Sequence, residues 1–203
     1  SIGLIMLAIL SPAKTLDYQT PLTVKKSTQP DFNAESSELV STLRKFAPGQ
    51  IGSLMKISDS LAELNHRRYA EWQADANEDN ARAAIFAFKG DVYQGLDAQT
   101  LGARDLNFAQ KHLRVLSGLH GLLRPLDLIQ PYRLEMGTRL TTRRGSNLYQ
   151  FWGDKVTDNI NKALAQQTSK VLVNLASNEY YKVVQPARIM GQILNINFKE
   201  LRD

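Results

Sequence analysis

The sequence predicts a mixed α/β fold in one compact domain, and three features support this prediction. Two short apolar segments, residues 4–10 and 170–176, have the composition of buried β-strands. Between and after them lie segments whose apolar residues recur every three or four positions, as in amphipathic helices. The 203 residues contain no internal repeat and no clear linker, and they suffice for one sizeable core.

The first strand leads into a segment that is expected to start a helix. Ser11 is a good N-cap residue and Pro12 suits the first helical position. Residues 20–30 contain two prolines and are expected to form an extended loop. Apolar periodicity then predicts a helix over 33–46 that Pro48-Gly49 ends, helical structure over 53–72 in two pieces, and a short helix over 77–88.

The second half of the chain continues the mixture of strands and helices. Alternating side chains in the segment after Pro131 are typical of extended backbone, and they place Arg133 and Glu135 on one face. The predicted elements after residue 130 are a strand-like segment over 132–141, a helix over 147–166, the strand over 170–176, a short helix over 177–184 and a strand over 189–201.

Two glycines, Gly118 and Gly121, interrupt a leucine-rich stretch in the middle of the chain. Each glycine would weaken a helix interior by about 0.5–1 kcal/mol relative to alanine, so we expect a turn between helices over 105–116 and 122–129. In this helix–hairpin–helix interpretation, exposed turn amides and the N-terminal end of the second helix receive a phosphate. The alternative is a helix–turn–helix corner packed in the core, where the glycines only allow close approach.

The positive charge of the protein is concentrated around these glycines. The net charge is +5, and residues 111–144 alone contain seven basic and two acidic side chains. This distribution favours a polyanionic partner, and we expect contact with the phosphate backbone of DNA that carries no base code. The candidate DNA-binding residues are Lys111, Arg114, Gly118, His120, Gly121, Arg124, Arg139, Arg143 and Arg144.

A second set of polar residues suggests a cleft for a small anionic substrate. Ser11 and Lys14 match the S-x-x-K pattern of serine acyl-transfer enzymes, but the companion S-D-N and K-T-G motifs are missing. The alternatives are a helix cap with a solvated lysine and a set of ordinary ion pairs. The candidate cleft residues are Ser11, Lys14, Lys89, Asp91, Arg133 and Glu135.

Metal and cofactor chemistry finds little support in the sequence. The absence of cysteine excludes disulfides, thiolate metal sites and cysteine nucleophiles. His66, His112 and His120 do not stand at ligand spacing, and neither G-x-G-x-x-G nor a P-loop is present. We therefore expect no metal site, no cofactor and no identified catalytic residue. His112 and His120 are expected to be surface or hydrogen-bonded residues.

The apolar start of the chain does not have the pattern of a signal peptide. It lacks a basic n-region and is too short to span a bilayer, so we expect a cytoplasmic protein without a membrane partner. Met6 is expected to be the natural start, which makes residues 6–203 the domain and residues 1–5 an addition. The oligomeric state stays open, with a monomer slightly favoured.

Five sequence blocks resemble the YaaA family of peroxide stress resistance proteins. The blocks are SPAKTLDY (11–18), FKGDVYQGL (88–96), LRVLSGLHGLLRPLDLIQPYRLEMG (113–137), LYQFWGD (148–154) and NLASNEYYK (174–182). The resemblance implies a cytosolic bacterial protein that keeps free iron low during oxidative stress and thereby limits hydroxyl-radical damage. It also implies an α/β fold with a helix–hairpin–helix element, here at 113–127, beside a positively charged cleft that binds double-stranded DNA. Family members continue for several tens of residues beyond Asp203, so we expect part of the family domain to be missing.

The sequence therefore leaves three hypotheses about the function open. The first is a DNA-binding protein of peroxide defence, the second an enzyme acting on a small anionic substrate, and the third direct binding of iron. The positions of three charged residues in the structure distinguish the first hypothesis from the second. If Lys14, Arg133 and Glu135 lie in one cavity, the small-substrate hypothesis gains.

Overall fold

Strand β1 (Leu7–Leu10) forms the middle of the main β-sheet of the computed structural model, which describes residues 6–196. The strand order is β6-β5-β1-β8-β9, and β1 runs parallel to both of its neighbours. Strand β9 is parallel to β8, and β6 is antiparallel to β5. The other strands of this sheet are β5 (Leu113–Ser117), β6 (Gly121–Leu123), β8 (Val171–Asn174) and β9 (Gln192–Asn195). The predicted mixed α/β class and the two predicted apolar strands are confirmed.

Two small antiparallel pairs accompany the main sheet. Strand β2 (Thr15–Leu16) pairs with β4 (Phe88–Lys89), and β3 (Arg82–Ala83) pairs with β7 (Leu128–Ile129). Within residues 6–196, the helices are α1 (Asn33–Leu43), α2 (Pro48–Met55), α3 (Asp59–Glu71), α4 (Ala84–Ala87), α5 (Asp91–Leu96), α6 (Ala103–His112), α7 (Leu148–Trp152), α8 (Lys155–Ala165) and α9 (Asn178–Tyr181), with short 3₁₀ turns at 98–100 and 186–188.

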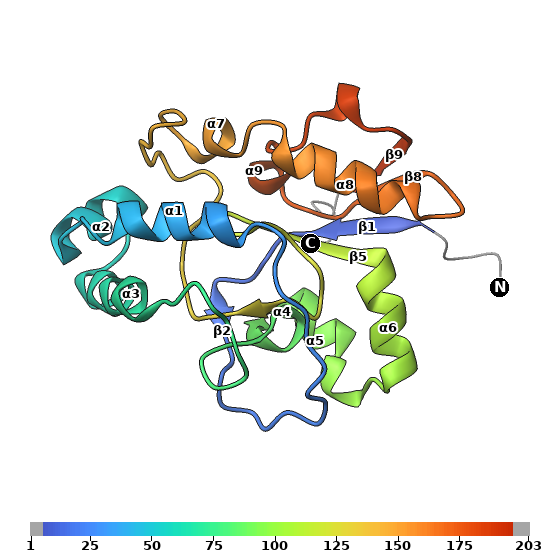
Figure 1. Ribbon diagram of the computed structural model, residues 1–203, viewed down its shortest axis with the longest axis horizontal. Coiled ribbons are helices and arrows are strands. Elements are labelled where there is room, and N and C mark those ends of the chain that lie inside the picture. The colour runs from blue at the N-terminus through green and yellow to red at the C-terminus, as the bar shows by residue number, and fades with distance from the viewer. Residues whose placement is uncertain (1–5, 197–203) are drawn as a thin grey trace, which may run out of the picture.

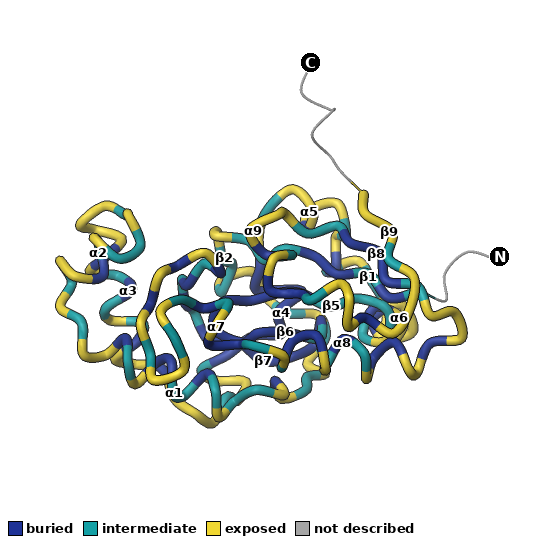
Figure 2. Tube along the Cα trace, turned by 90° about the horizontal axis from the view of Figure 1, so that it is seen from above, coloured by how far each residue is buried: buried dark blue, intermediate teal, exposed yellow. Residues whose placement is uncertain are grey.

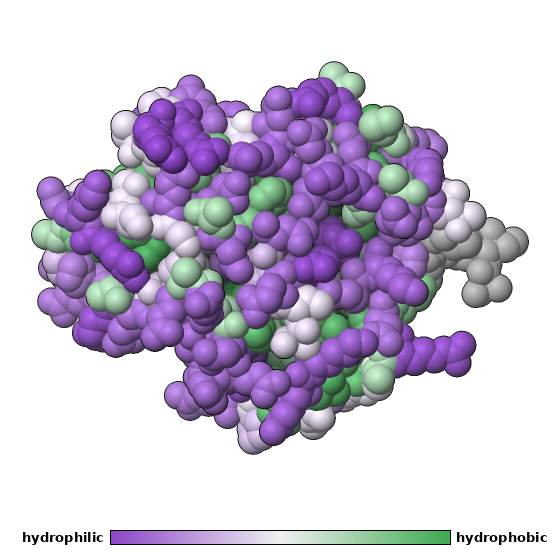
Figure 3. Space-filling model, in the orientation of Figure 1, coloured by the Kyte–Doolittle hydropathy of each residue, from purple (hydrophilic) through white to green (hydrophobic). Residues whose placement is uncertain are grey.

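The helices occupy separate parts of the molecule. Helices α1, α2 and α3 gather at one end, α6 lies at the other, and β1 and β5 run between them (Figure 1). The buried residues run through the middle of the molecule along the strands, whereas the loops and the end of the molecule that holds α2 are more exposed (Figure 2). The surface in the view of Figure 3 is mainly hydrophilic, with small scattered apolar patches. Every helix within residues 6–196 is too short or too polar to cross a membrane.

Side chains from distant parts of the chain build one large core. Leu7 and Ile9 of the central strand are fully buried, and Trp152 and Phe151 from α7 pack edge to face at 5.1 Å between ring centroids. Such aromatic pairs bury large apolar areas in a preferred geometry. The core therefore fixes the sheet against α7 and positions the loops at the ends of its strands.

The sequence predicted helices correctly where one face of the helix is buried, and it failed where every residue of the segment is buried. Helix α1 and the helical pair α2 and α3 match the predictions, although Pro48 begins α2 instead of ending a helix. The predicted helix over 77–88 is wrong, because only Ala84–Ala87 is helical and the residues on both sides pair as strands. Every residue of 81–88 is buried, so this segment has no exposed face to mark a helix.

The helix–hairpin–helix prediction is also wrong. Helix α6 ends at His112, and Leu113–Ser117 forms β5 beside β1, so the glycines lie in a β-hairpin between β5 and β6. Residues 122–129 form no helix. The leucines at 116–123 are buried, and a buried apolar run is equally typical of a central strand. Of the alternative interpretation, a helix–turn–helix corner packed in the core, only the packing is confirmed, because the glycines allow close approach but the corner joins two strands.

Other boundaries differ in smaller ways. Residues 11–14 form no helix, and the helix predicted over 147–166 is divided by Gly153 into α7 and α8. Gly153 has a φ of 51°, a left-handed conformation that suits glycine at a helix end. The short helix predicted over 177–184 is α9. Residues 1–5, and the end of the strand predicted over 189–201, lie outside the described residues.

Candidate anion-binding site

The candidate site lies where β1 and β8 end. Because the two strands are parallel neighbours, the residues that follow them, Ser11 and Ser177, meet at one edge of the sheet. The Ser177 amide donates to Ser11 Oγ at 2.8 Å, and the Ser11 hydroxyl donates to Ser177 Oγ at 3.3 Å. The chain passes from β1 to β5 on one side and later returns to β8 on the other, which makes this edge a topological switch point. Open α/β sheets bind their ligands at such points.

Three charged side chains converge beside this edge. Lys14 Nζ lies 3.3 Å from Glu135 Oε1, and a terminal nitrogen of Arg133 lies 3.2 Å from the same oxygen. The side chains of Arg133 and Glu135 are 20% and 26% exposed, whereas Lys14 is 69% exposed. One carboxylate is thus shared by two cations, which leaves one net positive charge. The prediction that Arg133 and Glu135 lie on one face is confirmed.

A small cavity of about 20 Å³ lies between these groups and two aromatic rings. Tyr132 and Tyr180 line it together with the three charged residues and the chain at Pro12-Ala13. This volume holds about one water molecule. The cavity therefore lies beside a surplus cation, and a larger anion would have to displace the Glu135 side chain.

Buried tyrosines hold the backbone of the site. The Tyr93 hydroxyl donates to the Ser11 carbonyl at 2.7 Å, and the Tyr69 hydroxyl donates to the Arg133 carbonyl. Tyr132 and Ser117 share a hydrogen bond of 2.6 Å. Burial raises the pKa of all three tyrosines, so they remain protonated and can donate. Sequence reasoning missed these residues, although Tyr93, Tyr132 and Tyr180 stand inside the motif blocks.

Three of the six candidate cleft residues, Ser11, Lys89 and Asp91, do not line the cavity. Lys89 and Asp91 are exposed, and Lys89 lines a different hollow with Asp17. Ser11 is next to the cavity, but its hydroxyl bonds to Ser177 while Lys14 bonds to Glu135. The serine and lysine that matched the acyl-transfer pattern therefore do not contact each other.

The predicted DNA-binding turn lies inside the protein. Gly118, His120 and Gly121 are buried, and His120 is only 1% exposed. The His120 amide donates to Ser117 Oγ at 3.1 Å, and its ring packs edge-on against Tyr132. The expectation that this turn offers its amides to a phosphate is wrong, because the hairpin is covered on both sides.

Most of the candidate basic residues have partners within the protein. Arg114 donates to the carbonyls of Gln110 and Leu113. Arg124 binds Asp127 at 3.0 Å and Asp31 at 3.3 Å. Arg143 and Arg144 each lie 2.9 Å from the Glu38 carboxylate of α1. The two remaining residues, Lys111 on α6 and Arg139, are exposed.

Comparison with known proteins gives the family. The family model described as peroxide stress protein YaaA matches residues 6–203. The chain belongs to this family. A UPF0246 protein of Shewanella loihica (strain ATCC BAA-1088 / PV-4) is 57% identical over 198 residues, which are 98% of this chain and 77% of the relative. The expected resemblance is therefore confirmed for residues 6–203.

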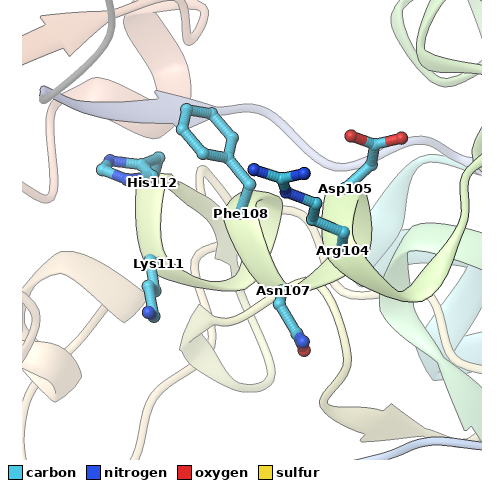
Figure 4. Close-up of a pocket in the computed structure, with 6 residues that line it drawn as sticks. All are labelled: Arg104, Asp105, Asn107, Phe108, Lys111 and His112. Carbon is cyan, nitrogen blue, oxygen red and sulfur yellow. The ribbon is translucent and has the colours of Figure 1, made fainter.

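The candidate DNA-binding residues at the surface of this family member lie at opposite ends of the molecule. Arg143 and Arg144 lie against α1 at one end, whereas Lys111 projects from α6 at the other (Figure 1, Figure 4). A hollow of about 370 Å³ lies against α6, and its described lining comes from that helix alone. Lys111 points to the opposite side of α6 from Phe108, whose ring stacks on His112 at 4.2 Å (Figure 4). The surplus charge thus does not gather around the hairpin.

Within residues 6–196, no group of three or more histidine, aspartate or glutamate side chains is placed to hold a metal ion. The histidine rings bind protein groups instead, with His112 Nδ1 lying 3.0 Å from the Met6 carbonyl and His120 Nδ1 lying 3.2 Å from Ser36 Oγ.

Proposed function

We propose that this peroxide stress protein binds a small anionic molecule at the ends of β1 and β8. One observation carries the proposal: Lys14 and Arg133 both approach the same oxygen of Glu135, at 3.3 and 3.2 Å. Two cations around one carboxylate oxygen have the geometry that a ligand carboxylate or phosphate oxygen requires. The position at a topological switch point supports the same conclusion.

Glu135 occupies the position that the ligand oxygen takes. In this proposal, the anion displaces the Glu135 carboxylate, and Lys14 and Arg133 transfer their ion pairs to the ligand. Lys14 is the mobile partner, because its side chain is mostly exposed, whereas Arg133 is held by the tyrosine on its carbonyl. Once displaced, Glu135 is the nearest group that could accept a proton from a bound substrate. The second hypothesis, an enzyme for a small anionic substrate, rests on this arrangement.

Calorimetric titration with inorganic phosphate and with malonate tests the proposal. We expect Lys14→Met and Arg133→Met to weaken binding at least tenfold, and Glu135→Gln to tighten it about tenfold, which corresponds to about 1.4 kcal/mol. Lys155→Met is the matched control, because Lys155 pairs with Glu35 at the same 3.3 Å elsewhere on the surface. If Glu135→Gln binds neither anion saturably, the site is a structural ion-pair cluster and the proposal fails.

Contact with double-stranded DNA is the second candidate function, and the loop over 138–145 supports it. Arg139 is exposed, the Arg143 side chain is 79% exposed, and Arg143 and Arg144 share the single carboxylate of Glu38. This loop therefore carries more positive than negative charge. In this proposal, it contacts the phosphate backbone without sequence preference and shields DNA during peroxide stress, when iron generates hydroxyl radicals.

Fluorescence anisotropy with a labelled duplex tests this candidate as salt is raised. We expect the double variant Arg139→Gln, Arg143→Gln to weaken binding and to flatten its salt dependence. Arg188→Gln is the control, because Arg188 pairs with Asp154 and Asp158 away from this loop. Equal affinity and equal salt dependence in all three proteins would remove the candidate.

A further inference from the structure

A second cavity, of about 330 Å³, has no lining residue in common with the Lys14 site. Its volume lies within the range of pockets that hold small organic ligands. The apolar part of its lining consists of Leu22, Val24, Ala81, Ala83 and Leu128. Ser27 and five charged side chains form the rest, and one of these, Arg82 of β3, is almost completely buried.

Arg82 differs from the other enclosed arginines in lacking hydrogen-bond acceptors. Its side chain is 9% exposed, and one terminal nitrogen is buried without a partner. That nitrogen lies 3.9 Å from Asp17 Oδ1, beyond hydrogen-bond distance. By contrast, Arg44 and Arg114 each donate to two backbone carbonyls. Within residues 6–196, the Arg82 side chain makes no hydrogen bond to protein.

The neighbours of Arg82 compensate its burial only in part. Asp17 Oδ1 already accepts from the amides of Gln19 and Thr20, at 3.0 Å each, and bonds to Thr20 hold the pKa of this carboxyl at about 2. The guanidinium also lies 5.9 Å above the Tyr18 ring. A buried guanidinium with unused donors is costly unless an acceptor reaches it. Arg82 lines the cavity, so an acceptor bound there would approach its guanidinium.

We propose that this cavity binds a small organic monocarboxylate. The carboxylate pairs with the Arg82 guanidinium, whose planar donors match it, and the apolar part of the ligand packs against Leu22, Val24 and Leu128. Three basic and two acidic side chains line the cavity, which leaves one surplus positive charge. Glu78 and Asp79 therefore disfavour a dianion such as phosphate. Lys26 is engaged with Asn107 at 2.6 Å, which leaves Lys25 as the second cation.

Titration of the unmodified protein with hexanoate, monitored by calorimetry and by protein NMR, tests this proposal. We expect saturable binding of hexanoate, binding at least tenfold weaker for the neutral analogue hexanamide, and no binding of inorganic phosphate at this cavity. Arg82→Gln is expected to weaken hexanoate binding at least tenfold. Arg188→Gln, a surface variant, is expected to bind as the unmodified protein does.

A second variant keeps the test decisive if Arg82→Gln does not fold. Val24→Trp fills the cavity from its half-buried wall and leaves Arg82 unchanged, and we expect it to lose hexanoate binding while the circular dichroism spectrum is preserved. The proposal is overturned if hexanoate does not bind saturably, if hexanamide binds equally well, or if Val24→Trp retains full affinity. In these cases Arg82 serves only as a structural counterion for Asp17.

Discussion

The indole nitrogen of Trp152 donates a hydrogen bond to the carbonyl of Gly118 at 3.0 Å, which fastens α7 to the turn between β5 and β6. The same indole ring covers Gly121, where a Cβ atom would lie 2.8 Å from a ring carbon. The two glycines of the leucine-rich stretch are therefore needed for close packing, and they give no access to a ligand.

Replacing either hairpin glycine should destabilise the protein strongly. A Cβ at Gly118 would lie 2.1 Å from the Leu134 carbonyl oxygen, and Gly121 has a φ of 71°. Overpacking at Gly118, and overpacking with a left-handed backbone at Gly121, predict a loss of about 2–5 kcal/mol in the free energy of unfolding for Gly118→Ala or Gly121→Ala. Urea denaturation measures this loss. Gly95→Ala is the control, because nothing lies within 4 Å of its Cβ in helix α5, and we expect it to be neutral or slightly stabilising.

Acid should destabilise the protein through His120. Burial lowers the pKa of this imidazole to about 3, from 6.5 in the unfolded chain. Between these values the unfolded state binds more protons, so the free energy of unfolding falls as the pH drops below about 6.5, by up to about 1.4 kcal/mol per pH unit. We expect His120→Phe to show a shallower fall in denaturation experiments between pH 7 and pH 4.5. Parallel curves for the two proteins would show that His120 does not titrate in this way.

Charge reversal at Arg124 should damage the fold. Arg124 pairs with Asp127, whose side chain is 1% exposed and also accepts from the hydroxyl of Thr28 at 2.6 Å. Arg124→Glu removes the partner of this buried carboxylate and adds a second negative charge, so we expect a loss of about 3–5 kcal/mol. Thermal unfolding followed by circular dichroism measures it, with the exposed Arg139→Glu as a near-neutral control. An unchanged melting temperature for Arg124→Glu would contradict a structural role.

Removing the Tyr69 hydroxyl should affect both stability and the anion site. Tyr69→Phe leaves the Arg133 carbonyl without its donor, which predicts a loss of about 1–3 kcal/mol. Because this bond positions Arg133, we also expect weaker phosphate binding in the calorimetric titration. Tyr181→Phe, at a partly exposed tyrosine, is the control. If Tyr69→Phe loses stability but binds phosphate normally, Tyr69 supports the core and does not position the site.

Local patterns in the sequence were sufficient for elements with one buried face. Helix α1 buries Leu39, Val40 and Leu43 and exposes the opposite side, and this periodicity predicts it well. The alternation after Pro131 likewise predicts that Arg133 and Glu135 lie together. Uniformly buried segments gave no such signal. Residues 81–88 and 113–123 are mostly apolar and almost entirely buried, and strand pairing with distant segments decided their conformation.

The sequence by itself determined the apolar segments that become the core, the excess of cations over 111–144 and the residue types available for anion binding. Only the tertiary structure decided which charges meet. Lys14 follows β1, yet its partner Glu135 comes from a distant extended segment, and Arg124 is neutralised by Asp31 and Asp127. The physical reason is that ion pairing depends on distance in space and on burial, both of which are set by how distant strands and loops pack together.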